Sequence, residues 1–282
     1  MKQVRKGVLA SSKSGNSFLL DTYTAAFAIS LRQLKTGVTN VVRVRRSSDN
    51  AEQDFTPTEI TDGTLTTFTG AGDGFIVTWY DQSGNSADVT QATAGSQPKI
   101  VSSGSVITKG SLPAVDFLAS SSQYLTRAAI SALDNGTEFS FFSVSSGRST
   151  GQVSGLLSTD PSGDRITVFH DTRTTPTRNL FVDTTVSTFT ADLSTARNNT
   201  NQRLVSSFCD SGLNISDFDD GATGGTDTVT GDWGNNILDI GRQNVGGVYM
   251  DGQIQEFIIF GSDQSANRVA IETEINGHYS IF

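Results

Sequence analysis

The sequence predicts an all-β protein, a jelly-roll β-sandwich of antiparallel sheets with short helices at its periphery. Two observations lead to this prediction. Much of the chain consists of short runs rich in β-branched and aromatic residues, separated by Gly, Asn, Asp and Ser. The chain also has 28 Gly but only five Pro, and short strands joined by such turns are typical of sandwiches and jelly rolls.

The chain is long enough for one large domain. Its 282 residues are 35% hydrophobic, which supplies ample material for a core. Cys209 is the only cysteine, so no intrachain disulfide can form and packing must hold the fold. We predict a single domain over residues 19–282. The arm before it, residues 1–18, is basic and then rich in Ser, Gly and Lys, which predicts a segment that is either mobile or ordered only against a partner.

A first helix is predicted over residues 22–36. Phe27, Leu31 and Leu34 recur there at i, i+4 and i+7, which places them in one apolar stripe. Gly37 follows as a stop signal. We expect this helix to pack against a larger β-structure.

A second helix is predicted over residues 265–277, where Ile271, Ile275 and His278 share a face. The segments between the two helices are predicted to be strands, because each is short and β-branched or aromatic. They are "FIVTWYD", "RITVFHD", "NLFVD", "RLVSSFCD", "LNISDF", "ILDIG" and "QIQEFIIF".

Charge and hydropathy exclude two classes of partner. The net charge is −9, whereas a general nucleic-acid binder needs a basic stripe to neutralise phosphates. No window approaches the roughly 20 apolar residues of a membrane span. The apolar run after the basic start is too short for a signal peptide, which predicts a protein that leaves its cell by lysis, as virion components do.

The C-terminal part resembles the end of laminin-G-like, concanavalin-A-like jelly rolls. In those proteins a strand leads into an Ile-Gly turn and a loop, and Asp-Gly then opens a long final apolar strand. The matching residues here are Ile240–Gly241, then Asp251–Glu256, and then the apolar run Phe257–Phe260. The resemblance implies a concanavalin-A-like sandwich in which Ile254, Phe257 and Ile259 supply core contacts.

The N-terminal part, residues 18–125, is similar to another group. The strings "WYDQSGN", "QPKIV" and "LPAVDF" follow one another in the order found in the catalytic domain of α-L-arabinofuranosidase B and in related phage modules. The resemblance implies the same fold and a retaining hydrolysis with two carboxylates. It also implies a vicinal disulfide in the sugar pocket, which a chain with one cysteine cannot form. The resemblance assigns the two catalytic carboxylates of the family to no particular residues of this chain.

The string "WYDQSGN" has two interpretations. In the first, it binds carbohydrate: Trp79 or Tyr80 stacks on a sugar while Asp81, Gln82 and Asn85 bind its hydroxyls. In the second, the aromatic residue is core and the polar residues bond the backbone of a turn. We favour the second interpretation, and these five residues remain our candidates for carbohydrate contacts.

Metal binding and catalysis have weaker signals. Asp217, Asp219 and Asp220 lie in an oxygen-rich stretch that suits calcium, although a hairpin turn with Asp220–Gly221 at its tip explains them better.

We assign no other cofactor and no catalytic residue. Glycoside hydrolysis needs two carboxyl groups about 5–9.5 Å apart, and the candidates to test are Glu256, Asp251, Glu138 and Asp81.

These features favour a bacteriophage virion protein: a head-fibre, capsid-decoration or tail-associated subunit with a lectin-like body. The N-terminal arm is expected to dock on other virion proteins, the chain to form a homo-oligomer, and the body to contact host-surface glycans. One alternative is an arabinofuranosidase-like glycoside hydrolase. Another is a glycan-binding adhesion or receptor-binding module.

Overall fold

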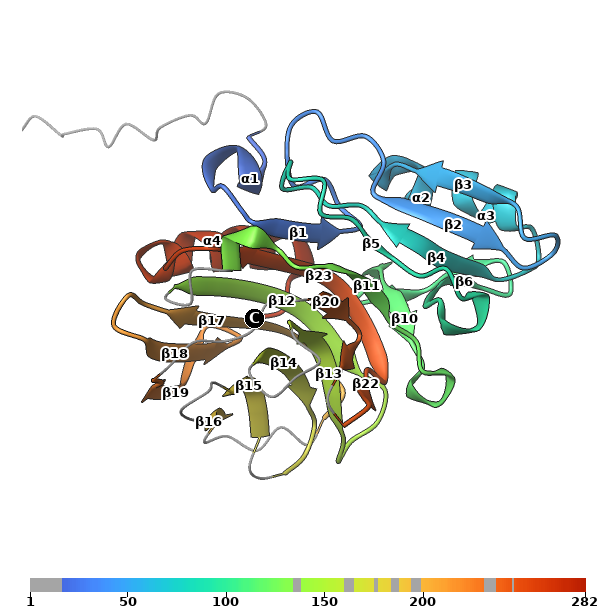
Figure 1. Cartoon of the computed structure of the whole chain (residues 1–282). Coiled ribbons are helices and arrows are strands. Elements are labelled where there is room, and N and C mark those ends of the chain that lie inside the picture. Colours follow the sequence, from blue (N-terminus) through green and yellow to red (C-terminus); the bar gives the residue numbers. More distant parts are fainter. Residues whose placement is uncertain are drawn as a thin grey trace, which may run out of the picture.

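The computed structural model describes residues 17–133, 138–159, 165–174, 177–183, 188–193, 199–230, 237–244 and 246–282. These residues form a predominantly antiparallel β-sandwich with a few short helices, consistent with a jelly-roll lectin-like fold (Figure 1). The predicted fold class is therefore confirmed. The predicted N-terminal arm lies outside the described residues, apart from its last two.

The first layer of the sandwich is built around β23, which pairs with β1, β10 and β12. From β12 the layer continues through β17 and β18 to β19. Its strands are β1 (Phe27–Ser30), β10 (Val115–Phe117), β12 (Phe139–Gly147), β17 (Gln202–Cys209), β18 (Asn214–Asp219), β19 (Ala222–Thr228) and β23 (Gly252–Phe260).

The second layer runs from β5 through β11, β20, β13, β14 and β15 to β16, each strand antiparallel to the next. The strands are β5 (Val89–Thr90), β11 (Leu125–Ala128), β13 (Val153–Ser158), β14 (Arg165–Asp171), β15 (Thr177–Asp183), β16 (Thr188–Leu193) and β20 (Ile237–Ile240). A small hairpin of β21 (Arg242–Gln243) and β22 (Val248–Tyr249) follows β20.

A lobe at one end joins the two layers (Figure 1). Its strand β4 pairs with β5 of the second layer and with β6, which in turn pairs with β10 of the first layer. The elements of the lobe are β2 (Val42–Arg46), β3 (Glu52–Phe55), α2 (Pro57–Thr61), α3 (Thr64–Thr69), β4 (Gly74–Trp79), β6 (Lys99–Ser102) and β7 (Ser105–Val106). A hairpin of β8 (Thr108–Lys109) and β9 (Leu112–Pro113) precedes β10.

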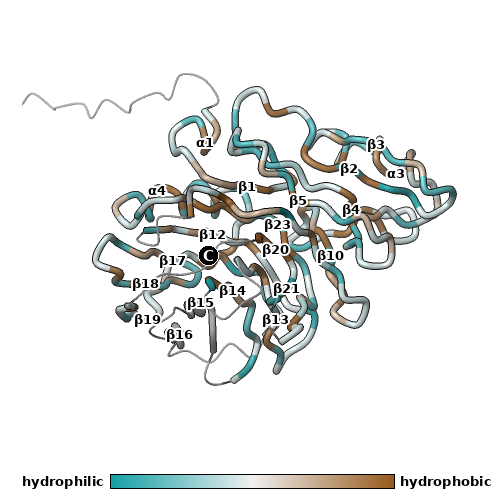
Figure 2. The backbone as a smooth tube through the Cα atoms, viewed as in Figure 1, coloured by the Kyte–Doolittle hydropathy of each residue, from teal (hydrophilic) through white to brown (hydrophobic). Residues whose placement is uncertain are grey.

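The main core lies between the two layers, where apolar residues meet (Figure 2). Phe141 of β12 stacks on Phe257 of β23, with ring centroids 5.8 Å apart. Leu157 and Val168 face them from the second layer. The core residues predicted for the last strand are buried as expected: Ile254, Phe257 and Ile259.

The second predicted helix is present as α4 (Arg268–Tyr279), preceded by a short 3₁₀ turn at Ser265–Asn267. It packs on the outer face of the first layer, where Ile271 and Ile275 meet a second cluster that includes Phe142 and Phe260. The prediction that His278 is the third residue of this face was wrong. Tyr279 is buried there, while His278 is exposed.

The prediction of a helix over residues 22–36 is wrong except at Thr22, which is helical. A single helical turn, α1 (Leu19–Thr22), ends before the apolar stripe, and Phe27 lies in strand β1. All four residues of β1 are buried, because the core covers one face of the strand and the second cluster covers the other. Pairing with β23 therefore decides the conformation of a segment whose apolar spacing suggested a helix.

No helix among the described residues is long and apolar enough to span a membrane.

Candidate functional site

The structure places the "WYDQSGN" residues at the end of β4. The Trp79 side chain is fully buried in the main core. Its nearest sequence neighbour, Tyr80, reaches the opposite face, where its hydroxyl donates to Asp54 Oδ1 at 2.8 Å. The aromatic pair is thus divided between core and surface, and Tyr80 is the member that a sugar can reach.

The polar residues that follow tie this turn to β1. Asp81 accepts hydrogen bonds from the backbone N–H groups of Ala28 and Ala87 at 2.9 and 3.0 Å. Gln82 is 1% exposed, and its Oε1 accepts from Leu34 N at 2.7 Å. Asn85 donates to the carbonyl of Ala26 at 3.0 Å. These contacts support the interpretation as a turn, and the carbohydrate role of the five residues stays a prediction.

The strand register reveals a feature of the second layer that the sequence did not. Directly opposed residues in antiparallel strands point to the same face of a sheet. Six polar residues on six neighbouring strands are opposed in this way, each to the next. They are Thr78 on β4, Thr90 on β5, Thr126 on β11, Asp239 on β20, Ser158 on β13 and Thr167 on β14. In the lobe, Arg43 opposes Thr78 and Asp54 opposes Arg43. We call these eight residues the polar row.

The polar row lies on the face opposite the core. The residues next to the polar row on these strands belong to the main core. Val42 is opposed to Trp79, and Ile240 is opposed to Leu157. Side chains alternate between the two faces of a strand, so the polar row must face away from the core.

One half of the polar row has buried side-chain oxygens although it does not face the core. Asp239, Ser158 and Thr167 have no exposed surface. Four buried side-chain oxygens of this half have no hydrogen-bond partner among the described residues: Thr126 Oγ1, Asp239 Oδ1, Ser158 Oγ and Thr167 Oγ1. A buried polar atom without a partner costs about 1–3 kcal/mol. Such groups are retained where they serve a ligand or ordered water, so this half of the row is our candidate functional site.

Arg242 and two tyrosines flank the site. Arg242 Nε donates to Asp239 Oδ2 at 2.8 Å, and its Cζ lies 3.7 Å from the centroid of the Tyr124 ring. Burial alone would lower the pKa of the Arg242 guanidinium, but its bond to Asp239 raises that pKa above the usual value. The Tyr124 and Tyr249 rings lie 6.4 Å apart. The site thus combines aromatic surface with hydroxyl and carboxylate oxygens.

The hairpin that carries Arg242 packs closely on β13. A Cβ on Gly155 would lie 2.6 Å from the carbonyl oxygen of Val248 and 2.8 Å from the carbonyl carbon of Arg242. Only glycine permits this approach, which places Arg242 beside Asp239.

At the lobe end of the row, Arg43 and Tyr80 share one carboxylate. Arg43 bonds Asp54 through Nε at 2.7 Å and Nη2 at 3.0 Å. The bond from Arg43 lowers the pKa of Asp54. Burial and the bond to Asp54 raise the pKa of Tyr80 to about 12. The tyrosine therefore remains a neutral hydrogen-bonding group at every physiological pH.

Replacing Asp54 by Asn is expected to lower the pKa of Tyr80 from about 12 while burial keeps it above the ordinary value. The negative charge of Asp54 opposes ionisation of the phenol, and Asn lacks that charge. A pH titration of ¹³Cζ-labelled tyrosine by NMR, with Tyr80 assigned through Y80F, measures the change. Asp49→Asn is the control, because Asp49 pairs with Arg46 instead. An ordinary pKa for Tyr80 in the unmodified protein would contradict the prediction.

The three proposed calcium residues each make a contact of their own within the protein or lie in the hairpin. Asp217 and Asp219 are buried on one face of β18, and Asp217 bonds the hydroxyl of Ser207. Asp220 accepts from the backbone N–H of Leu204 at 2.9 Å. The predicted hairpin tip is confirmed, since Asp220 and Gly221 have φ of 51° and 76° between β18 and β19. The described residues contain no group of three His, Cys, Asp or Glu side chains placed to hold a metal.

Two of the candidate carboxylates for hydrolysis, Glu256 and Asp251, lie apart from the polar row. Glu256 is buried on the outer face of the first layer and bonds Arg32, Ser30 and Tyr279. Asp251 pairs with Arg148 at 2.9 Å. Sequence reasoning missed Asp239, although its signal was available: a single acidic residue inside the apolar run "ILDIG".

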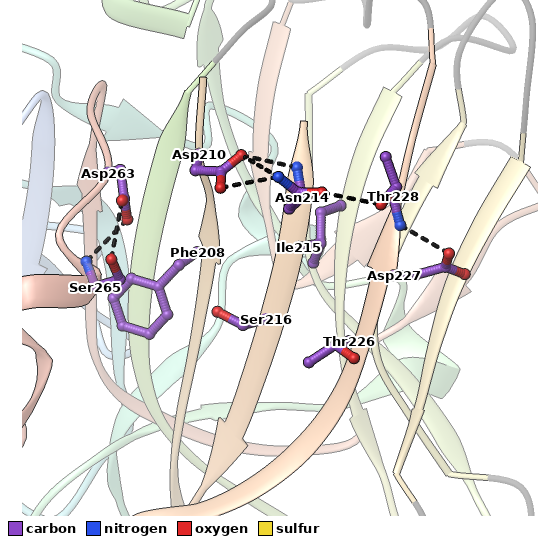
Figure 3. Close-up of a pocket in the computed structure, with 10 residues that line it drawn as sticks. All are labelled: Phe208, Asp210, Asn214, Ile215, Ser216, Thr226, Asp227, Thr228, Asp263 and Ser265. Carbon is purple, nitrogen blue, oxygen red and sulfur yellow. Dashed lines mark hydrogen bonds between the residues drawn. The ribbon is translucent and has the colours of Figure 1, made fainter. Parts of the chain in front are cut away.

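An open groove of about 330 Å³ crosses the outer face of β17, β18 and β19 (Figure 3). Asp210 in its wall bonds Asn214 Nδ2 at 3.0 Å, and Asp263 bonds the hydroxyl of Ser265 at 2.9 Å. The floor residue Phe208 is only 1% exposed. The groove therefore lacks the open aromatic platform of a typical sugar site, and we place the candidate site on the polar row.

No protein-family model and no curated protein matches the chain. Among solved structures, a GH54 α-L-arabinofuranosidase variant soaked with 4-nitrophenyl α-L-arabinofuranoside matches with a TM-score of 0.60 and 11% identity. An arabinofuranosidase complexed with arabinofuranosyl-α-1,2-xylobiose matches with a TM-score of 0.56 and 12% identity. Both alignments cover 89% of this chain and 62% of the other chain. A Ruminococcus gnavus sialidase CBM40 bound to α2,3-sialyllactose matches with a TM-score of 0.43 and 14% identity, over 51% of this chain and 86% of that module.

The arabinofuranosidase matches show a shared fold, and the chain spans 62% of the length of those enzymes.

Proposed function

We propose that this protein binds a glycan on the outer face of its second layer, at Thr126, Asp239, Ser158 and Thr167. The observation that carries the proposal is the set of buried oxygens on these four residues that lack a hydrogen-bond partner within the described chain. Sugar hydroxyls are both donors and acceptors, so one saccharide can satisfy hydroxyl and carboxylate oxygens together. Tyr124 and Tyr249 supply apolar surface for a sugar ring.

The fold shared with arabinofuranosidases supports a saccharide as the ligand. Hydrolysis of an arabinofuranoside is the second candidate function, favoured by this fold and by the buried carboxylate of Asp239. Retaining and inverting hydrolysis both require two carboxyl groups. Asp239 is the one carboxylate among the four described site residues, so we favour binding over catalysis.

The place of this body on a bacteriophage particle is a further part of the proposal. The Ser/Thr/Gly-rich composition and the sequence resemblance to phage modules support it. The basic arm over residues 1–18 would dock on other virion proteins, copies of the chain would form a homo-oligomer, and the lectin-like body would contact host-surface glycans. Detection of the protein in purified particles by mass spectrometry, and loss of its incorporation when residues 1–18 are deleted, would test this role.

Replacing Thr167 by Val is expected to weaken glycan binding while the protein becomes slightly more stable. Valine has nearly the same shape but removes an unpaired buried hydroxyl, so the free energy of unfolding should rise by about 1 kcal/mol. Ser158→Ala should act in the same way. Each lost hydrogen bond should weaken binding by roughly 3- to 10-fold.

Isothermal titration calorimetry with 4-nitrophenyl α-L-arabinofuranoside and arabinofuranosyl-xylobiose, preceded by a glycan array, measures the binding. Urea unfolding measures stability. Ser102→Ala, an exposed serine on β6, is the matched control and should change neither quantity. Binding that survives in both Ser158→Ala and Thr167→Val would refute the proposed site. Release of 4-nitrophenol by the unmodified protein would favour the hydrolase instead.

A further inference from the structure

We infer that the ligand is an extended neutral oligosaccharide, lying along the polar row from the sandwich into the lobe. This inference rests on the proposed glycan site and adds the size and charge of its ligand. It assigns a second group of contacts, Thr90, Thr78 and Tyr80, which lie outside that site.

The register gives the row its length. Asp239 and Arg43 are separated by four steps, through β11, β5 and β4 to β2. Neighbouring strands are about 4.8 Å apart, so the two residues lie on the order of 19 Å apart along the sheet. A single sugar ring is far shorter than this distance, whereas an oligosaccharide can contact both ends.

The exposure of the row changes along its length. Asp239 is fully buried, Thr126 and Thr78 are half-buried, and Thr90 is exposed. The accessible part of the row therefore runs from Thr126 across Thr90 and Thr78, and a ligand that bonds the buried oxygens would extend along it. At the far end Tyr80 is half-buried, with its hydroxyl held by Asp54, and it offers a fixed ring on which another sugar can pack.

The charges of the row select a neutral ligand. Arg43 and Asp54 form a two-point ion pair, and Asp239 pairs with Arg242. The remaining members of the row are Thr and Ser, which carry no charge. An anionic polymer would find no unpaired cation among the eight row residues, while uncharged hydroxyls can bond to all of them.

A length series of arabinoxylan oligosaccharides tests the inference by calorimetry on the full chain, with 4-nitrophenyl α-L-arabinofuranoside as the one-sugar probe. The unmodified protein should bind the long members more tightly than the one-sugar probe. The double variant Thr78→Val/Thr90→Val should lose about 10-fold or more in affinity for the long members and nothing for the one-sugar probe. Thr108→Val is the matched control, because Thr108 is an exposed strand threonine on β8, outside the row. Tyr80→Ala, which removes the ring, should likewise affect only the long members.

The outcomes separate this inference from the proposed function. Affinity that does not depend on length, with Thr167→Val still weakening the one-sugar probe, would leave the glycan site standing and overturn the extended track. Equal affinity of the double variant and the unmodified protein for the long members would also overturn it. Preferential binding of an acidic polysaccharide would refute the neutral ligand. Failure of every saccharide to bind the unmodified protein would remove both proposals together.

Discussion

Replacing Arg32 by Met is expected to destabilise the protein by about 3–5 kcal/mol, because it leaves a buried carboxylate without its cation. Arg32 bonds Glu256 through Nε at 2.7 Å and Nη2 at 3.0 Å, and Nη1 bonds Glu274 at 2.8 Å. The Glu256 side chain is 1% exposed. Burial alone would lower the pKa of Arg32, but the charge of Glu256 raises it well above the usual value. The guanidinium thus stays charged and ties the loop after β1 to β23 and α4.

Urea unfolding of the Arg32→Met variant measures this effect. Arg46→Met is the matched control, since Arg46 pairs with Asp49 at the surface, and exposed pairs contribute only about 0–1 kcal/mol. Adding Glu256→Gln to Arg32→Met should restore part of the loss, because the unpaired charge is then gone. Equal effects of the Arg32 and Arg46 substitutions would show that the buried network does not stabilise the fold as argued.

Replacing Gln82 by Leu is expected to cost about 3–5 kcal/mol, since each buried backbone group left without a partner costs about 1–3 kcal/mol. Gln82 Oε1 accepts from Leu34 N at 2.7 Å, and Nε2 donates to the carbonyls of Ser30 and Arg32, each at 3.0 Å. Leucine fills nearly the same volume, so the loss reports on hydrogen bonds and not on a cavity.

The neighbouring Gln33 provides the control for this variant. It is half-buried and makes one such contact, to the Lys35 carbonyl at 2.9 Å, so Gln33→Leu should cost less than about 1 kcal/mol. Wild-type stability in Gln82→Leu, together with lost glycan binding, would instead favour the sugar-contact role predicted for this residue from sequence.

Local features were predictable from the sequence because local chemistry decides them. The Asp220–Gly221 turn adopts positive φ at both residues, as its residue types favour. The last strand buries Ile254, Phe257 and Ile259, because a long apolar run can only be stable inside. The prediction of a helix over residues 22–36 was wrong because tertiary contacts, and not local chemistry, decide the conformation of this segment. Its spacing fits a helix, but burial on both faces and pairing with β23 make residues 27–30 a strand.

The sequence by itself determined the all-β class and the final helix, and it favoured a turn over residues 79–85, since side-chain periodicity and turn residues act over a few positions. Only the tertiary structure decided that Thr126, Asp239, Ser158 and Thr167 stand side by side. Each is an ordinary polar residue in its own strand. They become a site because strands from distant parts of the chain pair in one register, and a shift by one residue would turn any of them into the core.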